Sequence, residues 1–301
     1  MHPSIVFLGL TAFLLLWRVS VTPGAAPVLP PTVVGQDGAE MVLVPAGEFP
    51  MGSEAADIEA LQHLLQLLPP QVLERLSDQA PRHHVYLDAF YIDKYEVTNA
   101  LYAQFVQATR HQAPRLSTYQ QFNQPKQPVV GVTWHEAQAY CAWAGKRLST
   151  EAEWEKAARG SEGRIYPWGN HFDGPRLNYC DTHCPFDWKD TAIDDGYART
   201  APVGSYEQGK SPYGAYDMAG NVWEWVADWY SAEYYQHSPA QHPPGPVDGS
   251  HKVVRGGAWF VPAPATRTAT RQRFDNHYWG DNIGLRCALT PPPGDGSTPG
   301  R

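Results

Sequence analysis

Hydrophobic and polar residues follow strand-like and helix-like patterns in the first half of the chain. Met41–Phe49 is apolar with a Pro-Ala-Gly turn signal, which predicts a strand with a turn. Val85–Tyr91 alternates apolar and polar residues and predicts a half-buried strand. Threonine is a favourable first residue for a helix, because its hydroxyl can cap the free N–H groups. Three helices are predicted on this basis: Thr98 to about Thr109, Thr133 to Gly145, and Thr150 to about Arg159.

Two of these helices carry a stronger start signal. Thr133 and Thr150 are each followed three residues later by glutamate, at Glu136 and Glu153. This spacing is that of a capping box, in which side chain and backbone cap each other. Gly145 supplies the stop signal for the first of the two.

Residues 58–76 carry leucines and valines at helical spacing around Pro69-Pro70. The pattern predicts two short amphipathic helices. We interpret them as a helical insertion packed on the surface of the domain. The alternative is a lid or an element that docks a partner.

The N-terminal residues 1–26 contain an apolar run, Ile5–Trp17, that is too short for a comfortable membrane span. Its length is typical of a signal-peptide core, and small residues follow at 24–26. Because no Lys or Arg precedes the run and Arg18 follows it, an uncleaved N-terminal anchor is the alternative. Both interpretations place the body of the protein outside the cytoplasm, in the periplasm or secreted.

Composition predicts one large domain rich in turns. The chain has 301 residues, 43% of them hydrophobic, with 26 Gly, 28 Pro and 11 Trp. We expect a Pro- and Val-rich linker over 27–38, the domain over 39–290, and a disordered tail over 291–301. The formal net charge of −8 leaves no basic surface of the kind that nucleic acids require, so polynucleotide partners are not expected.

Four cysteines are present, and an even number in an exported chain predicts two disulfides. They are Cys141, Cys180, Cys184 and Cys287. Three pairings are possible.

The segment Tyr216–Trp225 combines a Gly-Asn turn signal with Glu224 between two tryptophans. A glutamate is not buried between large aromatic side chains unless its charge is paired. The segment therefore predicts a tight loop around a cation or around a buried hydrogen-bond network.

A series of motifs in this order resembles the formylglycine-generating enzyme, or sulfatase-modifying factor, family. The resemblance covers about residues 39–290 and implies a mixed α+β fold of the C-type-lectin-like kind with little regular secondary structure. The motifs are Met41–Gly52, Tyr95–Asn99, Pro128–Trp134, Ala144–Glu155, Tyr166–Asn170, Tyr216–Trp225, Val254–Trp259 and Gly284–Cys287.

The resemblance also implies calcium ions that stabilise loops, since Ca²⁺ binds six to eight oxygens from carboxylates, amides and backbone carbonyls. Carried over by motif, a first site would use Asp217, Gly220, Val222 and Glu224. A second site would use Asn178, Tyr179, Asp195 and Tyr197. The alternative is that these are ordinary turn residues and a hydrogen-bonded glutamate.

Other scaffold features are implied by the same resemblance. The family's structural disulfide would join Cys141 to Cys287. Three arginines, Arg267, Arg271 and Arg286, would make buried charge pairs, and substrate binding is the alternative role for them. For Cys180 and Cys184 we expect a local disulfide. A zinc site that includes His183, or a copper or redox role, is the alternative.

The sequence departs from the family where its chemistry is performed. Family oxidases convert a substrate cysteine to formylglycine with O₂, and bind copper(I) through two cysteines shortly after a Gly-Gly-Ser-Tyr motif. Thiolates are the soft ligands that Cu(I) prefers. Here Gly256-Gly257 is followed by Ala258, and no cysteine lies between Cys184 and Cys287. Copper-dependent formylglycine generation is therefore not expected.

Three functional hypotheses remain. The first is an exported, calcium-stabilised binding or accessory module for a peptide or small molecule. Its ligand cleft would be lined by Trp223, Ala258, Trp259, Phe260 and Tyr278. The second is an oxidase with different chemistry on a secreted peptide or siderophore, in which His251 or His277 serves a metal or a proton transfer. The third is formylglycine generation by an unrecognised site.

Overall fold

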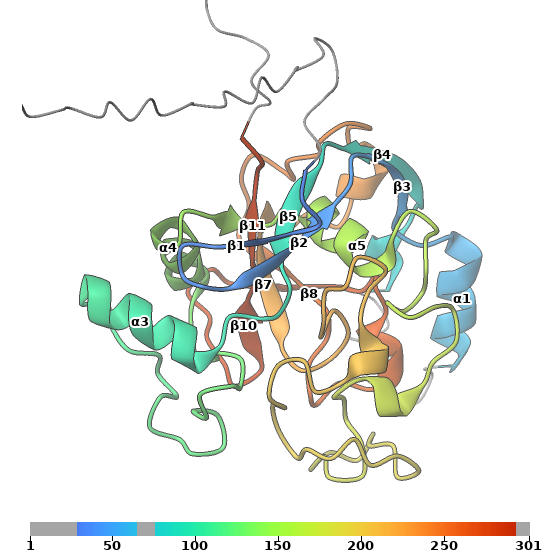
Figure 1. Cartoon of the computed structure of the whole chain (residues 1–301). Helices are drawn as coiled ribbons and strands as arrows, with labels where there is room; N and C mark the ends of the chain where they lie inside the picture. Colours follow the sequence, from blue (N-terminus) through green and yellow to red (C-terminus); the bar gives the residue numbers. More distant parts are fainter. Residues whose placement is uncertain (1–28, 65–75, 293–301) are drawn as a thin grey trace, which may run out of the picture. The chain divides into compact units, whose positions relative to one another are not determined.

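The structure is a computed structural model that describes residues 29–64 and 76–292, and the fold occupies Pro30–Pro292. Its strands form sheets of five, four and two strands, with helices around them (Figure 1). Regular secondary structure is sparse: from the end of helix α5 at Arg159 to strand β7 at Trp223, the chain forms only turns, loops and short 3-10 helices. None of the described helices has the length and hydropathy that crossing a membrane requires.

The five-stranded sheet has the order β1-β2-β5-β11-β6, with all neighbours antiparallel. Its members are β1 (Thr32–Val34), β2 (Glu40–Val44), β5 (Phe90–Asp93), β6 (Arg147–Leu148) and β11 (Cys287–Leu289). The strand that comes last in the chain, β11, therefore lies inside the sheet between two early strands.

The four-stranded sheet has the order β10-β7-β8-β9. Its members are β7 (Trp223–Trp229), β8 (Lys252–Arg255), β9 (Arg271–Phe274) and β10 (Ile283–Leu285). β10 runs parallel to β7, whereas the other pairs are antiparallel. The first four residues of β7 are all buried, so both faces of this strand are covered and Glu224 has no side open to water.

The predicted strands are each divided in two. A turn at Pro45-Ala46 separates β2 from β3 (Gly47–Met51), and β3 leaves the five-stranded sheet to pair with β4 (His83–Leu87). The segment predicted as one strand over Val85–Tyr91 contains the end of β4 and the start of β5.

The first predicted helix of the insertion is α1 (Ala55–Leu64), which begins slightly before the predicted start. Ile58 on α1 packs with Leu76 in a small cluster separate from the main core. The second predicted helix lies outside the described residues.

The threonine caps are confirmed at all three predicted helices, α3 (Asn99–Thr109), α4 (Trp134–Trp143) and α5 (Glu151–Arg159). Thr133 and Thr150 both form complete capping boxes with the glutamate three residues later. These signals were readable in the sequence because capping is a local interaction.

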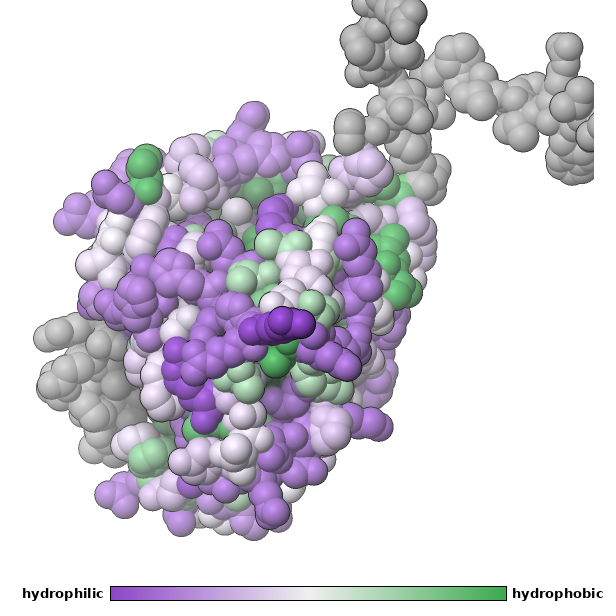
Figure 2. Space-filling model, turned by 90° about the vertical axis from the view of Figure 1, so that its left-hand side faces the viewer, coloured by the Kyte–Doolittle hydropathy of each residue, from purple (hydrophilic) through white to green (hydrophobic). Residues whose placement is uncertain are grey.

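Helices α3 and α4 lie on one side of the sheets in Figure 1, and α1 lies on the other. Seen from the α3–α4 side, the surface is largely hydrophilic and its hydrophobic residues form small separate groups (Figure 2). Scattered apolar residues of this kind do not mark a docking surface.

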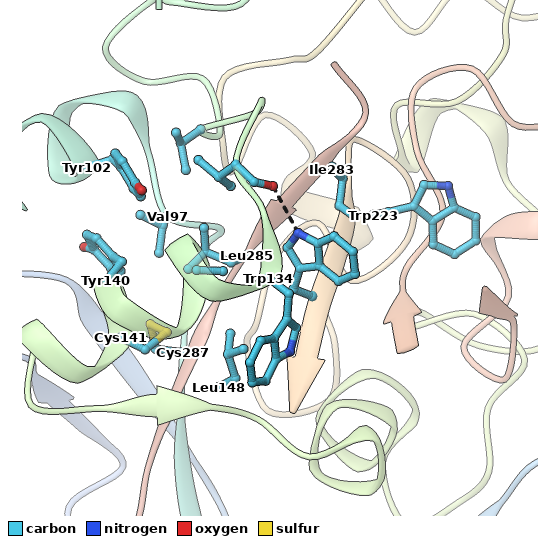
Figure 3. Close-up of a cluster of buried hydrophobic side chains, with 14 of the residues drawn as sticks. Val97, Tyr102, Trp134, Tyr140, Cys141, Leu148, Trp223, Ile283, Leu285 and Cys287 are labelled. Atoms are coloured by element: carbon cyan, nitrogen blue, oxygen red, sulfur yellow. Dashed lines mark hydrogen bonds between the residues drawn. A yellow bond between two sulfur atoms is a disulfide. The ribbon is translucent and has the colours of Figure 1, made fainter. Parts of the chain in front are cut away.

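The largest core cluster joins α4 to the four-stranded sheet (Figure 3). Trp134 and Trp225 are both buried, and each indole N–H finds a backbone acceptor. Trp134 donates to the Val226 carbonyl (2.8 Å) and Trp225 to the Val132 carbonyl (3.2 Å). These bonds remove the cost of burying polar groups inside an aromatic core.

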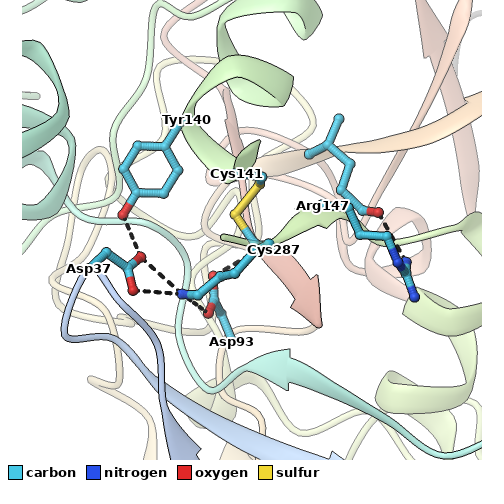
Figure 4. Close-up of a disulfide and its surroundings, with 8 residues drawn as sticks. Asp37, Asp93, Tyr140, Cys141, Arg147 and Cys287 are labelled. Atoms are coloured by element: carbon cyan, nitrogen blue, oxygen red, sulfur yellow. Dashed lines mark hydrogen bonds and ion pairs between the residues drawn. A yellow bond between two sulfur atoms is a disulfide. The ribbon is translucent and has the colours of Figure 1, made fainter. Parts of the chain in front are cut away.

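Both disulfides form as expected. Cys141 on α4 is bonded to Cys287 at the start of β11 (Figure 4), and Cys180 is bonded to Cys184. No cysteine is left free. The zinc alternative for Cys180 and Cys184 is therefore wrong, because both sulfur atoms are used in the disulfide.

The prediction of a linker over 27–38 is wrong for its described part. β1 pairs with β2, and Asp37 is buried against Lys146, whose Nζ lies 2.8 Å from Asp37 Oδ1 and 2.8 Å from Asp93 Oδ1 (Figure 4). The Pro- and Val-rich composition suggested an exposed segment, but a distant lysine attaches it to the core.

Candidate functional site

Glu224 is fully buried on β7, and Arg286 pairs its charge. Arg286 donates from Nε to Glu224 Oε2 (2.6 Å) and from Nη2 to Oε1 (2.7 Å), and Trp154 Nε1 donates to Oε2 (2.7 Å). A two-pronged guanidinium–carboxylate pair of this kind is among the strongest polar contacts in proteins. Of the two possibilities left open by the sequence, the hydrogen-bond network is therefore present.

Two more carboxylates, Glu96 and Asp217, are buried in the same region. No basic side chain in the described part of the chain lies within ion-pair distance of either. Glu96 Oε2 accepts a hydrogen bond from Asn221, but its Oε1 is buried without a partner. Asp217 accepts the Gly204 N–H and no other described donor. Burial, followed by the charges of Asp217 and Glu224, raises the pKa of Glu96 well above its ordinary value.

Burial likewise raises the pKa of Asp217 to about 6, although the Gly204 N–H and Arg286 oppose the shift. Of the three buried carboxylates Glu96, Asp217 and Glu224, only Glu224 has a guanidinium partner among the described residues. When all three are ionised, the group carries two uncompensated negative charges, which one divalent cation would neutralise. We call these three residues the acidic cluster.

The turn that precedes β7 brings this cluster together. Asp217 and Asn221 both have positive φ angles (57° and 60°), a conformation that Asp and Asn tolerate better than most residues. Gly220 lies between them with φ 81°, and a Cβ there would sit 2.1 Å from the Asn178 carbonyl oxygen. Val222 is fully buried. The turn therefore requires glycine and places the predicted first-site residues in one buried loop.

Three of the four residues predicted for the second site meet at Asp195. Asp195 Oδ2 accepts the Tyr179 N–H (3.0 Å) and Oδ1 accepts the Tyr197 N–H (2.9 Å). Asn178 Oδ1 is buried without a partner. Burial is the main cause that raises the pKa of Asp195 to about 7, and the charges of Asp181 and Asp194 add to it. Amide and carboxylate oxygens without a charged partner are the ligand types that calcium uses.

The two predicted sites are connected. Asn178 Nδ2 donates to Asn221 Oδ1 (3.0 Å), and Asn221 Nδ2 donates to Glu96 Oε2 (2.7 Å). The sequence analysis missed Glu96 and Asn221 as site residues. Their signal was available, because Glu96 is a charged residue inside the Tyr95–Asn99 motif and Asn221 supplies the turn residue before β7.

The predicted ligand cleft is not formed as expected. Trp223, Ala258 and Trp259 are buried in the core. Ala258 and Trp259 follow β8 directly, after the Gly256-Gly257 turn. Phe260 is half-buried, and Tyr278 stacks on Phe274 with 36% of its surface exposed. Only these last two predicted cleft residues reach the surface.

The segment after Gly257 is covered by the loop that begins with the small disulfide. Cys180 N–H donates to the Val261 carbonyl (3.0 Å), and Trp188 Nε1 donates to the Phe260 carbonyl (2.9 Å). Phe186 stacks on Trp188 at 4.6 Å. The family's metal thiolates would occur along this segment, and here Val261 and its neighbours are held by backbone and aromatic contacts.

The disulfide loop also places Asp181, His183 and Asp194 together, with one possible ligand atom from each within 4.8 Å of the others. Asp181 is buried, and its two oxygens accept the His183 and Asp195 N–H groups. His183 and Asp194 are exposed. The other candidate histidines lie elsewhere: His251 contacts Ser250, and the His277 ring lies tilted against the His135 ring at the surface.

A second buried charge network surrounds α5. Glu155 Oε1 accepts from Arg159 (2.6 Å), and Glu155 Oε2 accepts from Arg255 (2.6 Å). Glu151 forms a two-pronged pair with Arg271 (2.7 and 2.9 Å). Burial alone would raise the pKa of Glu155, but Arg255 and Arg159 hold it below its ordinary value. We call these five residues the α5 network. The expected charge pairs are thus found for Arg271 and Arg286 but not for Arg267.

Comparisons with known proteins agree with this architecture. The family model described as "Sulfatase-modifying factor enzyme 1-like domain" matches residues 27–291. The formylglycine-generating enzyme of Streptomyces coelicolor is 33% identical over 314 aligned residues, covering 89% of this chain and 94% of that protein. The bovine inactive C-alpha-formylglycine-generating enzyme 2 is 40% identical over 176 residues, covering 56% of this chain and 52% of that protein.

The fold is also found among solved structures. PvdO from Pseudomonas aeruginosa matches with a TM-score of 0.69 and 28% identity, covering 87% of this chain and 99% of that one. The predicted mixed α+β architecture with few helices is therefore confirmed.

Proposed function

The chain belongs to the sulfatase-modifying factor family, and from this premise we propose that it is a calcium-stabilised binding or accessory module without copper-dependent formylglycine-generating activity. The observation that supports the proposal is the bonding state of the cysteines. All four cysteines are in disulfides, so no thiolate is available for Cu(I). The segment after Gly257 offers Ala258 and Val261 where the family's chemistry would require polar and thiol groups.

The direct test is a peptide assay. A Cys-X-Pro-X-Arg peptide is incubated with the protein, Cu(I) and O₂, and its mass is followed. We expect no conversion of cysteine to formylglycine, whereas the Streptomyces coelicolor relative serves as the positive control. Conversion that depends on added copper would contradict the proposal.

Calcium binding is supported by the buried oxygens that the protein does not satisfy by itself. Glu96 Oε1 and Asn178 Oδ1 have no partner, and Asp195 has no basic side chain at ion-pair distance among the described residues. The acidic cluster would hold one ion and the Asn178–Asp195 group another. Calcium would neutralise buried negative charge there and take no part in a reaction. Metal analysis of the purified protein by mass spectrometry should find calcium and neither copper nor iron at stoichiometric levels.

A second candidate is an oxidase with different chemistry on a secreted peptide or siderophore. It is favoured by the grouping of Asp181, His183 and Asp194. Those three residues would hold the metal, which would supply the redox chemistry. Stoichiometric iron or copper that is lost in a His183→Ala variant would support this candidate over the first.

We further propose that the protein acts outside the cytoplasm on a peptide or small-molecule ligand. Two disulfides are typical of oxidising compartments and support export. Residues 1–26, the proposed signal peptide or anchor, lie outside the described residues. Cell fractionation of the full chain and of a form without residues 1–26 tests the proposal: the full chain should be extracytoplasmic and the shortened form should remain in the cytoplasm.

A further inference from the structure

Five arginines are buried in the part of the chain that the structure describes, and one of them differs from the others. Four of the five contact glutamate carboxylates: Arg159, Arg255, Arg271 and Arg286. Arg267 is 7% exposed, and no described carboxylate lies within ion-pair distance of it. Its contacts are Nη2 to Gln79 Oε1 (2.6 Å) and Nε to the Pro264 carbonyl (3.3 Å).

A buried guanidinium with only neutral partners is costly, because desolvation of the charge is not offset by an opposite charge. Burial accordingly lowers the pKa of Arg267, although Tyr166 and Asp57 oppose the shift. The four other arginines show that this fold pairs its buried guanidinium groups with acids. Arg267 is therefore a buried cation for which no described side chain supplies the neutralising anion.

Arg267 lines a cavity of about 240 Å³ that opens between α1 and the segment Arg267–Ala269. Two more arginines, Arg82 and Arg159, line the same cavity, together with the apolar side chains of Leu61 and Ile165. The cavity is small compared with typical ligand pockets of about 300–1,000 Å³, so it suits a small molecule or the end of a larger one. It shares no residue with the acidic cluster.

The charges around the cavity are unequal. Among the described residues, its one acidic lining residue is Asp57, which pairs with Arg82 at the exposed rim (3.2 Å). Glu54, also exposed, lies 3.6 Å from Arg82. Arg159 is paired with Glu155, but Glu155 also serves Arg255, and Arg159 Nε is buried without a partner. The described acidic side chains therefore do not balance the positive charge that faces the cavity.

We propose that this cavity binds the oxyanion group, a carboxylate or a phosphate, of a small ligand between Arg267, Arg159 and Arg82. The planar guanidinium groups present N–H donors in the fork geometry that both anions accept. The apolar walls would contact the uncharged part of the ligand. The proposal is independent of the calcium sites and of the loss of copper chemistry.

The test is calorimetric titration and thermal unfolding of the full chain with inorganic phosphate and with succinate, each compared with chloride at the same ionic strength. Either anion should bind and raise the melting temperature, and the stronger of the two identifies the phosphate or the carboxylate as the preferred group. The absence of any effect beyond that of chloride overturns the proposal.

Variants separate binding from structure. Arg82→Gln at the rim should weaken binding about tenfold or more, consistent with the loss of one charge-assisted contact. Arg176→Gln is the matched control, because the Arg176 side chain is also 32% exposed and also paired with an aspartate. It should leave binding unchanged, and equal loss in the two variants would contradict a specific site.

Arg267→Gln gives the sharpest readout. It removes an unpaired buried charge, so the variant should melt at a higher temperature than the natural protein in chloride and should no longer respond to phosphate or succinate. A lower melting temperature in chloride, or an undiminished response to the anions, would show that Arg267 is structural and would overturn the assignment.

Discussion

The α5 network and the acidic cluster are both buried groups of charged side chains, but they are balanced differently. In the α5 network, Glu151 and Glu155 are paired by three arginines from α5, β8 and β9. In the acidic cluster, only Glu224 has a guanidinium partner, Arg286, among the described residues. Every carboxylate of the α5 network is therefore paired, whereas Glu96 and Asp217 would be neutralised by the proposed calcium ion. We expect the α5 network to stabilise the fold with or without calcium, and the acidic cluster to do so only with calcium bound.

The largest expected effect concerns the complete network. Glu155→Gln leaves Arg159 and Arg255 without their shared acid, and loss of one partner of a buried pair costs about 3–5 kcal/mol. Urea unfolding should show this loss equally with calcium and with EGTA. Glu162→Gln, which removes an exposed partner of Arg164, is the control and should leave the urea midpoint unchanged. If the stability lost in Glu155→Gln depended on calcium, the proposed difference between the two regions would be wrong.

Calcium removal should produce the next largest effect. A ligand that binds only the folded state at 1,000 times its Kd contributes about 4 kcal/mol to the free energy of unfolding. We expect EGTA to remove a contribution of about this size and to lower the melting temperature. Magnesium should not restore it, because Mg²⁺ requires a smaller octahedral site. Identical unfolding curves in calcium and EGTA would contradict the proposed sites.

The third prediction is a pH dependence in EGTA. Burial raises the folded-state pKa of Asp217 to about 6 and of Asp195 to about 7, above the value of about 3.9 in an unfolded chain. The folded state therefore binds more protons, and stability is lost as the pH rises through 6 and 7. Lowering the pH from 8 to 5.5 in EGTA should let these two groups contribute about 1–3 kcal/mol of stabilisation.

Calcium should reverse this trend, because it binds the ionised carboxylates. Burial also raises the pKa of Asp228 to about 8, but that group lies outside the predicted calcium sites. The difference between the unfolding free energies with and without calcium across the pH range is therefore the quantity to measure. Parallel curves would contradict calcium binding at Asp217 and Asp195.

The smallest expected effect is at Glu96, where one substitution should change the unfolding free energy in opposite directions with and without calcium. Glu96→Gln removes one of three buried like charges, so in EGTA it should stabilise the protein by about 1 kcal/mol, within the usual range of single substitutions. In calcium it should destabilise the protein, because an oxygen ligand with charge is lost. Urea unfolding in EGTA and in calcium measures these two opposite effects. Glu40→Gln, at a partly exposed pair with Lys94, is the control and should show no such reversal between EGTA and calcium.

The sequence predicted those parts of the molecule that depend on neighbouring residues. The threonine caps at Thr98, Thr133 and Thr150 are local, and the structure confirms all three. The pairing of Glu224 with Arg286 was predicted only in part. The sequence indicated that the charge of Glu224 needs a partner but did not indicate which residue supplies it. The two residues are 62 positions apart, so only the parallel pairing of β7 with β10 brings them together.

The errors have the same origin. Asp37 was assigned to a linker because its surroundings are rich in Pro and Val, and its partner Lys146 lies 109 residues later. Trp223 and Ala258 were assigned to a cleft because aromatic and small residues often line one, but both faces of β7 are covered. In each case a long-range contact decided the outcome, and no local pattern records such contacts.

The position of β11 in the five-stranded sheet also determines when the protein can fold during synthesis. β5 ends at residue 93 and β6 at residue 148, yet the strand that joins them is Cys287–Leu289. A ribosome that has made most of the chain has therefore produced β5 with an open edge and β6 without its partner strand, and open edges invite pairing with other chains. The five-stranded sheet can close only after the last strand of the domain has been synthesised.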